Sequence, residues 1–168
     1  MLKKIDPKEL NANPFTLLDN DWALLMAGDK DSFNSMTVSW GGVGVLWRKN
    51  VTTVYVRQSR YTKEFMDNSE YYTLTFLKDG FKDKLSLLGT KSGKEIDKMN
   101  VEGLNLVELE NGFGYEESKL IFVCKKLFKN DLKESQFLVD GLFGECYPDK
   151  DDFHTMYIGE IVGCYING

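Results

Sequence analysis

Residues 51–62 have the sequence VTTVYVRQSRYT, and they predict a strand that turns directly into a short helix. The first part is rich in β-branched side chains and ends in a charge, which is typical of a β-strand. A helix is predicted over residues 62–68, where the hydroxyl residue Thr62 marks its start. The polar stretch 57–62 is therefore expected to join the two elements.

Other parts of the chain predict mostly short strands. In residues 34–41 every second residue is apolar, which predicts a strand with Met36, Val38 and Trp40 on one face. Further strands are predicted at residues 23–27, 71–77, 104–109, 119–127 and 156–166. Besides 62–68, helices are predicted at residues 82–88 and 94–99. This pattern predicts a mainly β fold with short helices, a barrel or sandwich, and argues against a doubly wound parallel sheet.

Composition limits the class of protein. The 168 residues are 42% hydrophobic and 28% charged, which suits a single globular domain over residues 1–168. The net charge of −5 argues against a nucleic-acid-binding surface. The longest uncharged stretch, residues 32–47, is too short and too polar for a membrane helix, and the charged start of the chain lacks a secretory signal. We therefore expect a cytoplasmic protein without membrane or nucleic-acid partners.

Cysteine and histidine usage excludes several kinds of site. Cys124, Cys146 and Cys164 are dispersed without a CxxC pair, so reduced thiols are expected in place of disulfides or a zinc site. His154 is the only histidine, which excludes a His-rich metal site. The chain also lacks the GxGxxG, GxxxxGK[ST] and GxSxG motifs, so nucleotide folds that depend on those loops are not expected.

The turn at residues 57–62 carries the clearest chemistry. Arg57 and Arg60 supply guanidinium groups, Ser59 and Thr62 supply hydroxyls, and the start of a helix supplies free amides. These groups together suit a phosphate monoester, because paired donors and positive charge bind such an anion. The alternative is a solvated turn with a hydroxyl cap, and the turn by itself leaves both interpretations open.

A second candidate is the strand end that follows residue 34. If the apolar face packs inward, the hydroxyls of Thr37 and Ser39 face a crevice beside Gly41, Gly42 and Gly44. Glycine lets a flat ligand approach the backbone closely. The alternative, which these residues alone favour, is a glycine-rich strand end or bulge.

Two smaller features have mainly structural interpretations. The loop at residues 89–94 is small and polar, but its spacing fails the phosphate-loop pattern, so a surface turn is expected. His154 follows Asp151 and Asp152, whose charges would favour its protonated form and contact with an anion. A structural histidine is the alternative.

Taken together, these stretches resemble the flavin reductase-like family, whose FMN-binding domains form a split β-barrel. The resemblance covers nearly the whole chain, through residues 34–41, 44–47, 55–62, 89–93, 97–98, 124–127 and 154–161. The flavoredoxin-like branch is the most similar. Gln58 departs from the family pattern, which usually has proline there, and this should loosen the turn modestly without removing a phosphate donor.

The resemblance implies where FMN would bind. The turn at residues 57–62 would hold the phosphate, with Arg57, Ser59 and Thr62 as the most direct donors. The full set of implied cofactor-binding residues is Asn34, Met36, Thr37, Val38, Ser39, Trp40, Arg57, Ser59, Arg60, Tyr61, Thr62, Ser92, Gly93 and Lys94. No catalytic residue is implied with certainty, and His154 is a candidate contact for the reductant.

The function implied by the resemblance is that of an FMN-binding oxidoreductase. The first hypothesis is an NAD(P)H-dependent flavin reductase, in which NADH or NADPH passes a hydride to flavin N5. The alternative is an FMN electron-transfer protein that a redox protein partner supplies with electrons. A non-redox module that binds another small anion is a third. Family members are homodimers with flavin near the subunit interface, so a homodimer is expected here.

Overall fold

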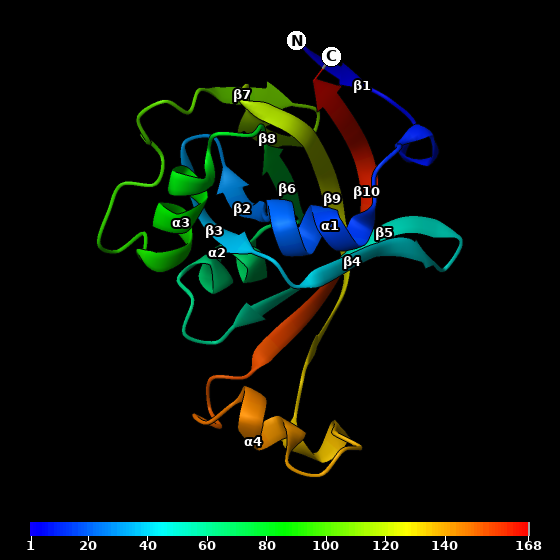
Figure 1. Cartoon of the computed structure of the whole chain (residues 1–168), viewed down its shortest axis with the longest axis vertical. Helices are drawn as coiled ribbons and strands as arrows, with labels where there is room; N and C mark the ends of the chain where they lie inside the picture. The colour runs from blue at the N-terminus through cyan, green and yellow to red at the C-terminus, as the bar shows by residue number, and fades with distance from the viewer. Residues whose placement is uncertain (168) are drawn as a thin grey trace.

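Eight antiparallel strands form the main sheet of the protein in a computed structural model that describes residues 1–167 (Figure 1). They are β1 (Leu2–Lys4), β2 (Ala23–Asp29), β3 (Ser32–Val38), β4 (Gly41–Leu46), β5 (Lys49–Arg57), β6 (Tyr71–Leu77), β9 (Ser118–Asp131) and β10 (His154–Asn167). The order is β3-β2-β6-β9-β10-β5-β4, and β1 adds to β10. A separate pair of strands consists of β7 (Leu106–Leu109) and β8 (Gly112–Tyr115).

The helices are short and lie in the connections between strands. They are α1 (Pro14–Thr16), α2 (Thr62–Asn68), α3 (Lys82–Thr90) and α4 (Leu142–Cys146), with the 3-10 helices η1 (Pro7–Glu9) and η3 (Glu134–Gln136) and the π-helix η2 (Leu17–Asp21). The expected fold class, mainly β with short helices, is therefore confirmed. Within residues 1–167, none of the helices is long and apolar enough to span a membrane.

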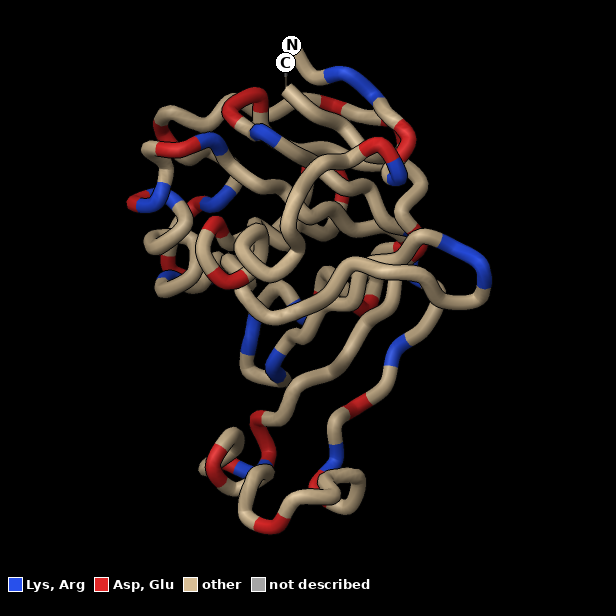
Figure 2. The backbone as a smooth tube through the Cα atoms, turned by 45° about the vertical axis from the view of Figure 1, so that its right-hand side comes forward, with Lys and Arg blue, Asp and Glu red and all other residues tan. Residues whose placement is uncertain are grey.

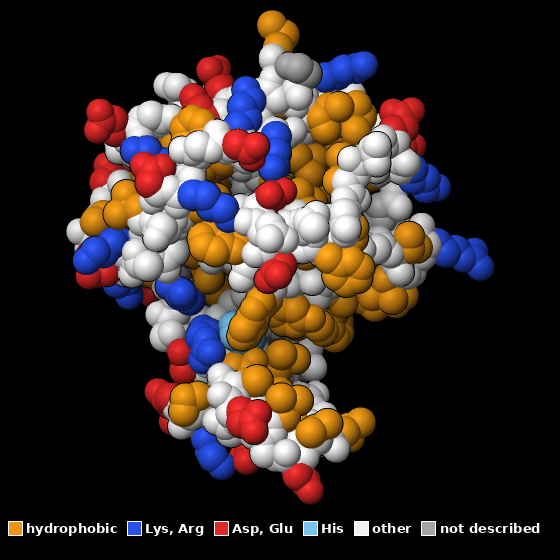
Figure 3. Space-filling model, in the orientation of Figure 1, with side chains coloured by type: hydrophobic (Ala, Val, Ile, Leu, Met, Phe, Trp, Pro, Cys, Tyr) orange, Lys and Arg blue, Asp and Glu red, His pale blue; other side chains and the backbone are white. Residues whose placement is uncertain are grey.

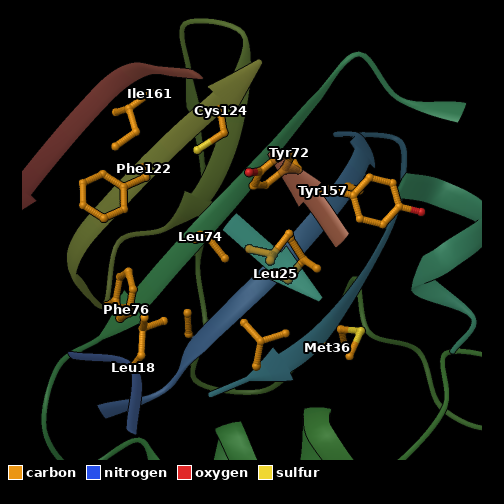
Figure 4. Packing of buried hydrophobic residues seen from close by; sticks show 14 of the residues in the cluster. Leu18, Leu25, Met36, Tyr72, Leu74, Phe76, Phe122, Cys124, Tyr157 and Ile161 are labelled. Carbon is orange, nitrogen blue, oxygen red and sulfur yellow. The ribbon is translucent and has the colours of Figure 1, made fainter. Parts of the chain in front are cut away.

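One row of buried side chains runs across five neighbouring strands. The strand registers place five residues of the main core side by side: Met36, Leu25, Leu74, Phe122 and Cys164. Because side chains alternate between the two faces of a strand, residues paired in register share one face. Figure 4 shows Leu25, Leu74 and Phe122 within this core, with Tyr157 beside them. The row lines the interior of the curved sheet.

The second core lies on the opposite face of β2. Leu24 and Met26 alternate with Leu25, and they pack against Leu85 and Leu88 of α3. Strand β2 is thus buried on both faces, which explains its continuous apolar sequence. The packing fixes α3 beside β3 and sets the position of the loop that follows α3.

Two expectations about this part of the fold are wrong. Residues 94–99 form turns in place of a helix, because Ser92 and Asp97 accept hydrogen bonds from the backbone N–H groups of Lys94 and Met99. Such side-chain contacts compete with helical hydrogen bonds. The strand predicted over residues 34–41 ends at Val38, so Trp40 does not continue the buried face of Met36 and Val38 and is 57% exposed.

The glycine-rich stretch after β3 forms a strand, not only a strand end or bulge. β4 pairs with β5 from Gly41–Val54 to Leu46–Lys49 and occupies one edge of the sheet. The close approach of β5 requires glycine at position 41, where a Cβ would overlap the carbonyl oxygen of Thr53.

The two longest strands carry an extension away from the barrel. β9 and β10 pair along most of their length, and residues 132–153 connect them at the far end (Figure 1). Figure 2 shows this connection hanging below the sheet, with acidic and basic segments along it. β10 begins at His154, which pairs with Arg57 at the end of β5. The connection therefore returns directly to the turn after β5.

Candidate functional site

Two adjoining cavities lie where β3 and β5 end and α2 begins. The first has a volume of about 300 Å³ and is lined by Asn34, Met36, Arg57, Ser59, Arg60, Tyr61, Thr62, Thr90, Lys91, Ser92, Gly93, Glu95, Lys98 and Asp152. The second, of about 160 Å³, is lined by Met36, Thr37, Val38, Ser39, Trp40, Tyr55, Arg57, Arg60 and His154. Met36, Arg57 and Arg60 belong to both, so the cavities form one elongated site with a cationic end and an aromatic end.

The sequence-derived residues gather at this site with one exception. Every residue implied for cofactor binding lines one of the two cavities, apart from Lys94. The Lys94 ammonium instead lies 3.2 Å from Glu64 Oε1 and 4.6 Å from the centroid of the Tyr61 ring. Its side chain is thus engaged by α2, outside the cavity lining.

Arg57 is held by the connection between β9 and β10. Its Nη1 donates to the backbone oxygen of Asp152 at 3.0 Å, and its Nη2 donates to that of Cys146 at 3.2 Å. The guanidinium carbon lies 5.2 Å from the centroid of the Tyr147 ring. These contacts restrict the orientation of the guanidinium, so one cation of the site is preorganised.

A carboxylate already lies among the expected phosphate donors. The backbone N–H of Ser59 donates to Asp152 Oδ1 at 2.8 Å, and Asp152 Oδ2 lies 3.7 Å from Arg57 Nη1. The sequence indicates only that the Asp152 charge lies near His154, and it does not predict a contact with Ser59. Its place in the cavity depends on the return of the chain from the β9–β10 connection, which no local pattern reveals.

Besides Arg57, the first cavity is lined by Arg60, Lys91 and Lys98. Arg60 Nη1 donates to the backbone oxygen of Gly89 at 2.9 Å. Lys98 is buried, and its Nζ donates to the backbone oxygens of Ser35 and Leu88 at 2.8 and 2.7 Å. Burial and, to a smaller extent, the neighbouring Arg60 charge lower the pKa of Lys98 to about 8, against an opposing effect of Glu95. Lys98 was not predicted as a site residue, although it lies in one of the stretches that carry the resemblance.

The loop after α3 closes over the first cavity through Gly93. A Cβ at this position would overlap Oδ1 of Asn34 and come within 3.1 Å of the Tyr61 ring. Asn34 is itself buried, and its Nδ2 donates to Thr62 Oγ1 at 2.8 Å. Glycine thus permits a close contact between this loop, β3 and the start of α2.

His154 forms the centre of the aromatic end. Its Nδ1 lies 2.8 Å from the Tyr147 hydroxyl, and its ring centroid lies 5.4 Å from that of Trp40. Figure 3 shows the histidine between basic side chains and an apolar surface. Burial lowers the pKa of His154 to about 4, and the Arg57 charge adds to this, whereas Asp152 acts in the opposite direction. Asp152 therefore favours the protonated form, as expected, but burial and the Arg57 charge outweigh it, so that the pKa of His154 is lowered overall.

The two hydroxyls expected at the end of β3, those of Thr37 and Ser39, are only partly available to a ligand. Thr37 and Ser39 line the second cavity, as expected. However, Thr37 Oγ1 donates to the backbone oxygen of Leu85 in α3. The Thr37 hydroxyl therefore retains only its acceptor capacity for a ligand.

A larger cavity lies on the other side of α2 and has a different character. It has a volume of about 700 Å³, and Glu64, Glu70 and Glu108 are among the residues that line it. Tyr61 is shared with the first cavity. Its acidic rim is unsuited to a phosphate, so the smaller cationic cavity is the better candidate for an anionic ligand.

Comparison with solved structures identifies the fold. Flavoredoxin from Methanosarcina acetivorans aligns with 88% of this chain and 68% of its own, at 21% identity and a TM-score of 0.66. An FMN-binding domain of a flavin reductases-like enzyme from Shewanella baltica aligns with 99% of this chain and 77% of its own, at 14% identity and a TM-score of 0.68. The chain has the flavin reductase-like FMN-binding fold. The expected split β-barrel is thereby confirmed.

A flavin reductase is also among the solved structures with this fold. The styrene monooxygenase flavin reductase from Pseudomonas putida S12 aligns with 86% of this chain and 78% of its own, at 12% identity and a TM-score of 0.62. No protein-family model and no curated protein matches the chain. At these identities the likeness establishes the fold alone.

The residues of this flavin reductase-like fold fit FMN. Arg57, Arg60 and the Ser59 N–H offer donors and positive charge at one end, which suits a phosphate monoester. Trp40 and Tyr55 flank the narrower cavity at the other end, where a planar ring could lie against them. Glycine at position 93 lets the loop after α3 approach Asn34 and Tyr61 closely, and all three residues line the cationic cavity.

Proposed function

We propose that the protein binds FMN in the two adjoining cavities and acts as a flavin reductase that uses NADH or NADPH. The observation that carries this proposal is the meeting of Arg57, Arg60 and the Ser59 N–H in a cavity that continues to the aromatic pocket around His154. This arrangement matches a ligand that is dianionic at one end and flat at the other. The flavin reductase-like fold supports the same ligand.

The cationic cavity would bind and orient the phosphate. Arg57 is fixed by backbone oxygens, so little side-chain freedom is lost when it meets an anion. Arg60 and Lys98 add positive charge from the neighbouring wall. Since the net charge of the chain is −5, this local concentration of cations distinguishes the site from the rest of the surface.

The aromatic cavity would orient the flat part of the ligand. Bound FMN would supply the hydride-accepting chemistry. The chain would contribute the walls, with Met36 between the two cavities and Trp40 and Tyr55 along the second. His154 is neutral at physiological pH because of its lowered pKa, so it would act through hydrogen bonds and shape without adding positive charge.

Reconstitution followed by anaerobic reduction tests this function. The purified protein is incubated with FMN, freed of unbound flavin and titrated with NADH or NADPH in the absence of oxygen. We expect a yellow protein that bleaches with one of the two dinucleotides. A yellow protein that bleaches with neither would contradict the reductase, and a colourless protein would favour a module for another small anion.

An FMN electron-transfer protein is the second candidate. It is favoured by the structural likeness to flavoredoxin from Methanosarcina acetivorans, which extends over 88% of this chain. In that case a redox protein would supply the electrons. Comparison of the reduction rates with NADH, NADPH and a reduced ferredoxin-type donor separates the two candidates, because only the reductase should react faster with a dinucleotide.

We also propose that the protein forms a homodimer through the apolar surface beside the site. Trp40, Val45, Trp47 and Phe128 are 57%, 72%, 55% and 42% exposed, and the Trp47 and Phe128 rings lie 6.1 Å apart. Figure 3 shows an extended apolar surface next to the histidine. β4 is also an edge strand with free backbone groups. A second copy would cover the exposed aromatic side chains and the free backbone groups of β4. It would also close the second cavity on the side of the exposed Trp40.

The conformation of the β4–β5 hairpin tip also supports this interface. Trp47 and Arg48 both have positive φ, at 52° and 59°. Glycine or asparagine usually occupies such turn positions, so a tryptophan there is strained and still largely exposed. Burial of the Trp47 side chain against a partner would offset the cost of its strained backbone and of its exposed apolar surface.

A further inference from the structure

The carboxylate of Asp152 occupies donors that a phosphate would need. Oδ1 accepts the Ser59 N–H at 2.8 Å, and Oδ2 lies 3.7 Å from Arg57 Nη1. Carboxylate and phosphate oxygens take the same kind of charge-assisted hydrogen bond. Asp152 also lines the cationic cavity, so its charge lies inside the proposed binding site.

The backbone keeps this carboxylate near the turn. The Gln58 N–H donates to the backbone oxygen of Phe153 at 3.2 Å, and Arg57 Nη1 donates to that of Asp152 at 3.0 Å. The backbone at Asp152 and Phe153 is thus hydrogen-bonded alongside Arg57 and Gln58. A bound anion could displace the side chain from Ser59, but the negative charge would remain close to it.

We propose that Asp152 sets the affinity and selectivity of the site by competing with the ligand's phosphate for the Ser59 N–H and the Arg57 guanidinium. The inference rests on the proposed function and extends it. Two like charges within a few ångströms repel each other, so Asp152 weakens the binding of any phosphorylated ligand. An uncharged flavin meets no such repulsion. Asp152 is therefore expected to reduce the preference for FMN over riboflavin and to favour an exchangeable cofactor.

The test compares Asp152→Asn with Asp151→Asn. Asparagine keeps a side-chain oxygen for the Ser59 N–H and the backbone oxygen for Arg57. It removes the charge and places an NH2 group where the second carboxylate oxygen was. Asp151 is exposed and does not line either cavity, so its variant controls for the change in net charge. We expect Asp152→Asn to tighten FMN binding about tenfold and to leave riboflavin binding unchanged. The control should bind both flavins as the wild type does.

Inorganic phosphate provides a readout that does not depend on flavin. Titration of ¹⁵N-labelled protein with phosphate is followed at the Ser59 amide, and Asp152→Asn should bind phosphate about tenfold more tightly than the wild type. If phosphate behaves in this way while no flavin binds, the proposed function fails and the inference stands. The inference is overturned if FMN or phosphate binds Asp152→Asn no more tightly than Asp151→Asn, or if riboflavin gains as much as FMN.

Discussion

Arg57 at the end of β5 and His154 at the start of β10 are direct partners in the sheet. Their pairing places the Arg57 guanidinium, which lines both cavities, next to the imidazole that lines the second. It also explains a chemical property, because the Arg57 charge adds to burial in lowering the pKa of His154. The two ends of the candidate site are thus joined by a single pair of residues on neighbouring strands.

Replacement of Arg57 by alanine should weaken FMN binding. The change removes charge-assisted hydrogen bonds worth about 1.5–3 kcal/mol, which corresponds to a roughly ten- to hundredfold increase in Kd. Quenching of flavin fluorescence measures the Kd, and Lys8→Ala, which removes an exposed cation that lines neither cavity, serves as the control. An unchanged Kd in a folded Arg57→Ala protein would mean that the phosphate binds elsewhere.

Stability should depend on pH through His154. Its pKa is about 4 in the folded protein, against an ordinary value of 6.5. Between these values the unfolded chain binds the additional proton, so stability falls as pH decreases from about 6.5 to 4 and is unaffected by this group at higher pH. The Tm of the wild type should therefore drop more steeply than that of His154→Asn between about pH 7.5 and 4.5. Parallel curves would refute the buried, neutral histidine.

Gly93→Ala should disturb both the fold and the site. The added Cβ would overlap Oδ1 of Asn34, and the Asn34 Nδ2 donates to Thr62 Oγ1. Either the loop at residue 93 or the Asn34 side chain must therefore move, and a move of Asn34 would disturb its bond to Thr62. We expect a loss of about 1–3 kcal/mol of stability in urea unfolding and weaker FMN binding. Gly144→Ala in α4, where a Cβ meets no atom within 4 Å, is the matched control and should be neutral or slightly stabilising. Equal behaviour of the two variants would contradict the close contact at Gly93.

A charge on the edge strand should prevent dimerisation. Val45 is 72% exposed on β4, so Val45→Glu should leave the fold intact and place a charge in the proposed interface. Sedimentation velocity should show a dimer for the wild type and for the control Val162→Glu on β10, and a monomer for Val45→Glu. A wild type that is monomeric at every concentration would refute the homodimer.

The local elements of the fold follow closely from the sequence. The strand predicted at residues 71–77 has the bounds of β6, and the helix predicted at residues 62–68 has the bounds of α2. The aromatic and β-branched residues of the stretch 71–77 strongly favour a strand. Glycine-rich β4 and β8 were not predicted, because their strand character depends on pairing with a neighbour and not on their own side chains.

The candidate site was predictable where its residues lie in the turn or in β3, and unpredictable where distant segments meet. Arg57, Ser59 and Arg60 follow one another, so their shared chemistry is visible in the sequence. Asp152 reaches Ser59 only because β10 pairs with β5, and Lys98 is buried only because α3 packs against β3. Both contacts depend on tertiary packing.

Titration of the wild-type protein with FMN and with riboflavin tests the central claim most directly, because the two flavins differ only in the phosphate. If the turn at residues 57–62 holds that phosphate, FMN should bind at least about tenfold more tightly than riboflavin at low ionic strength. The difference should shrink as salt is added. Equal affinities for the two flavins, or no binding of FMN, would contradict the account.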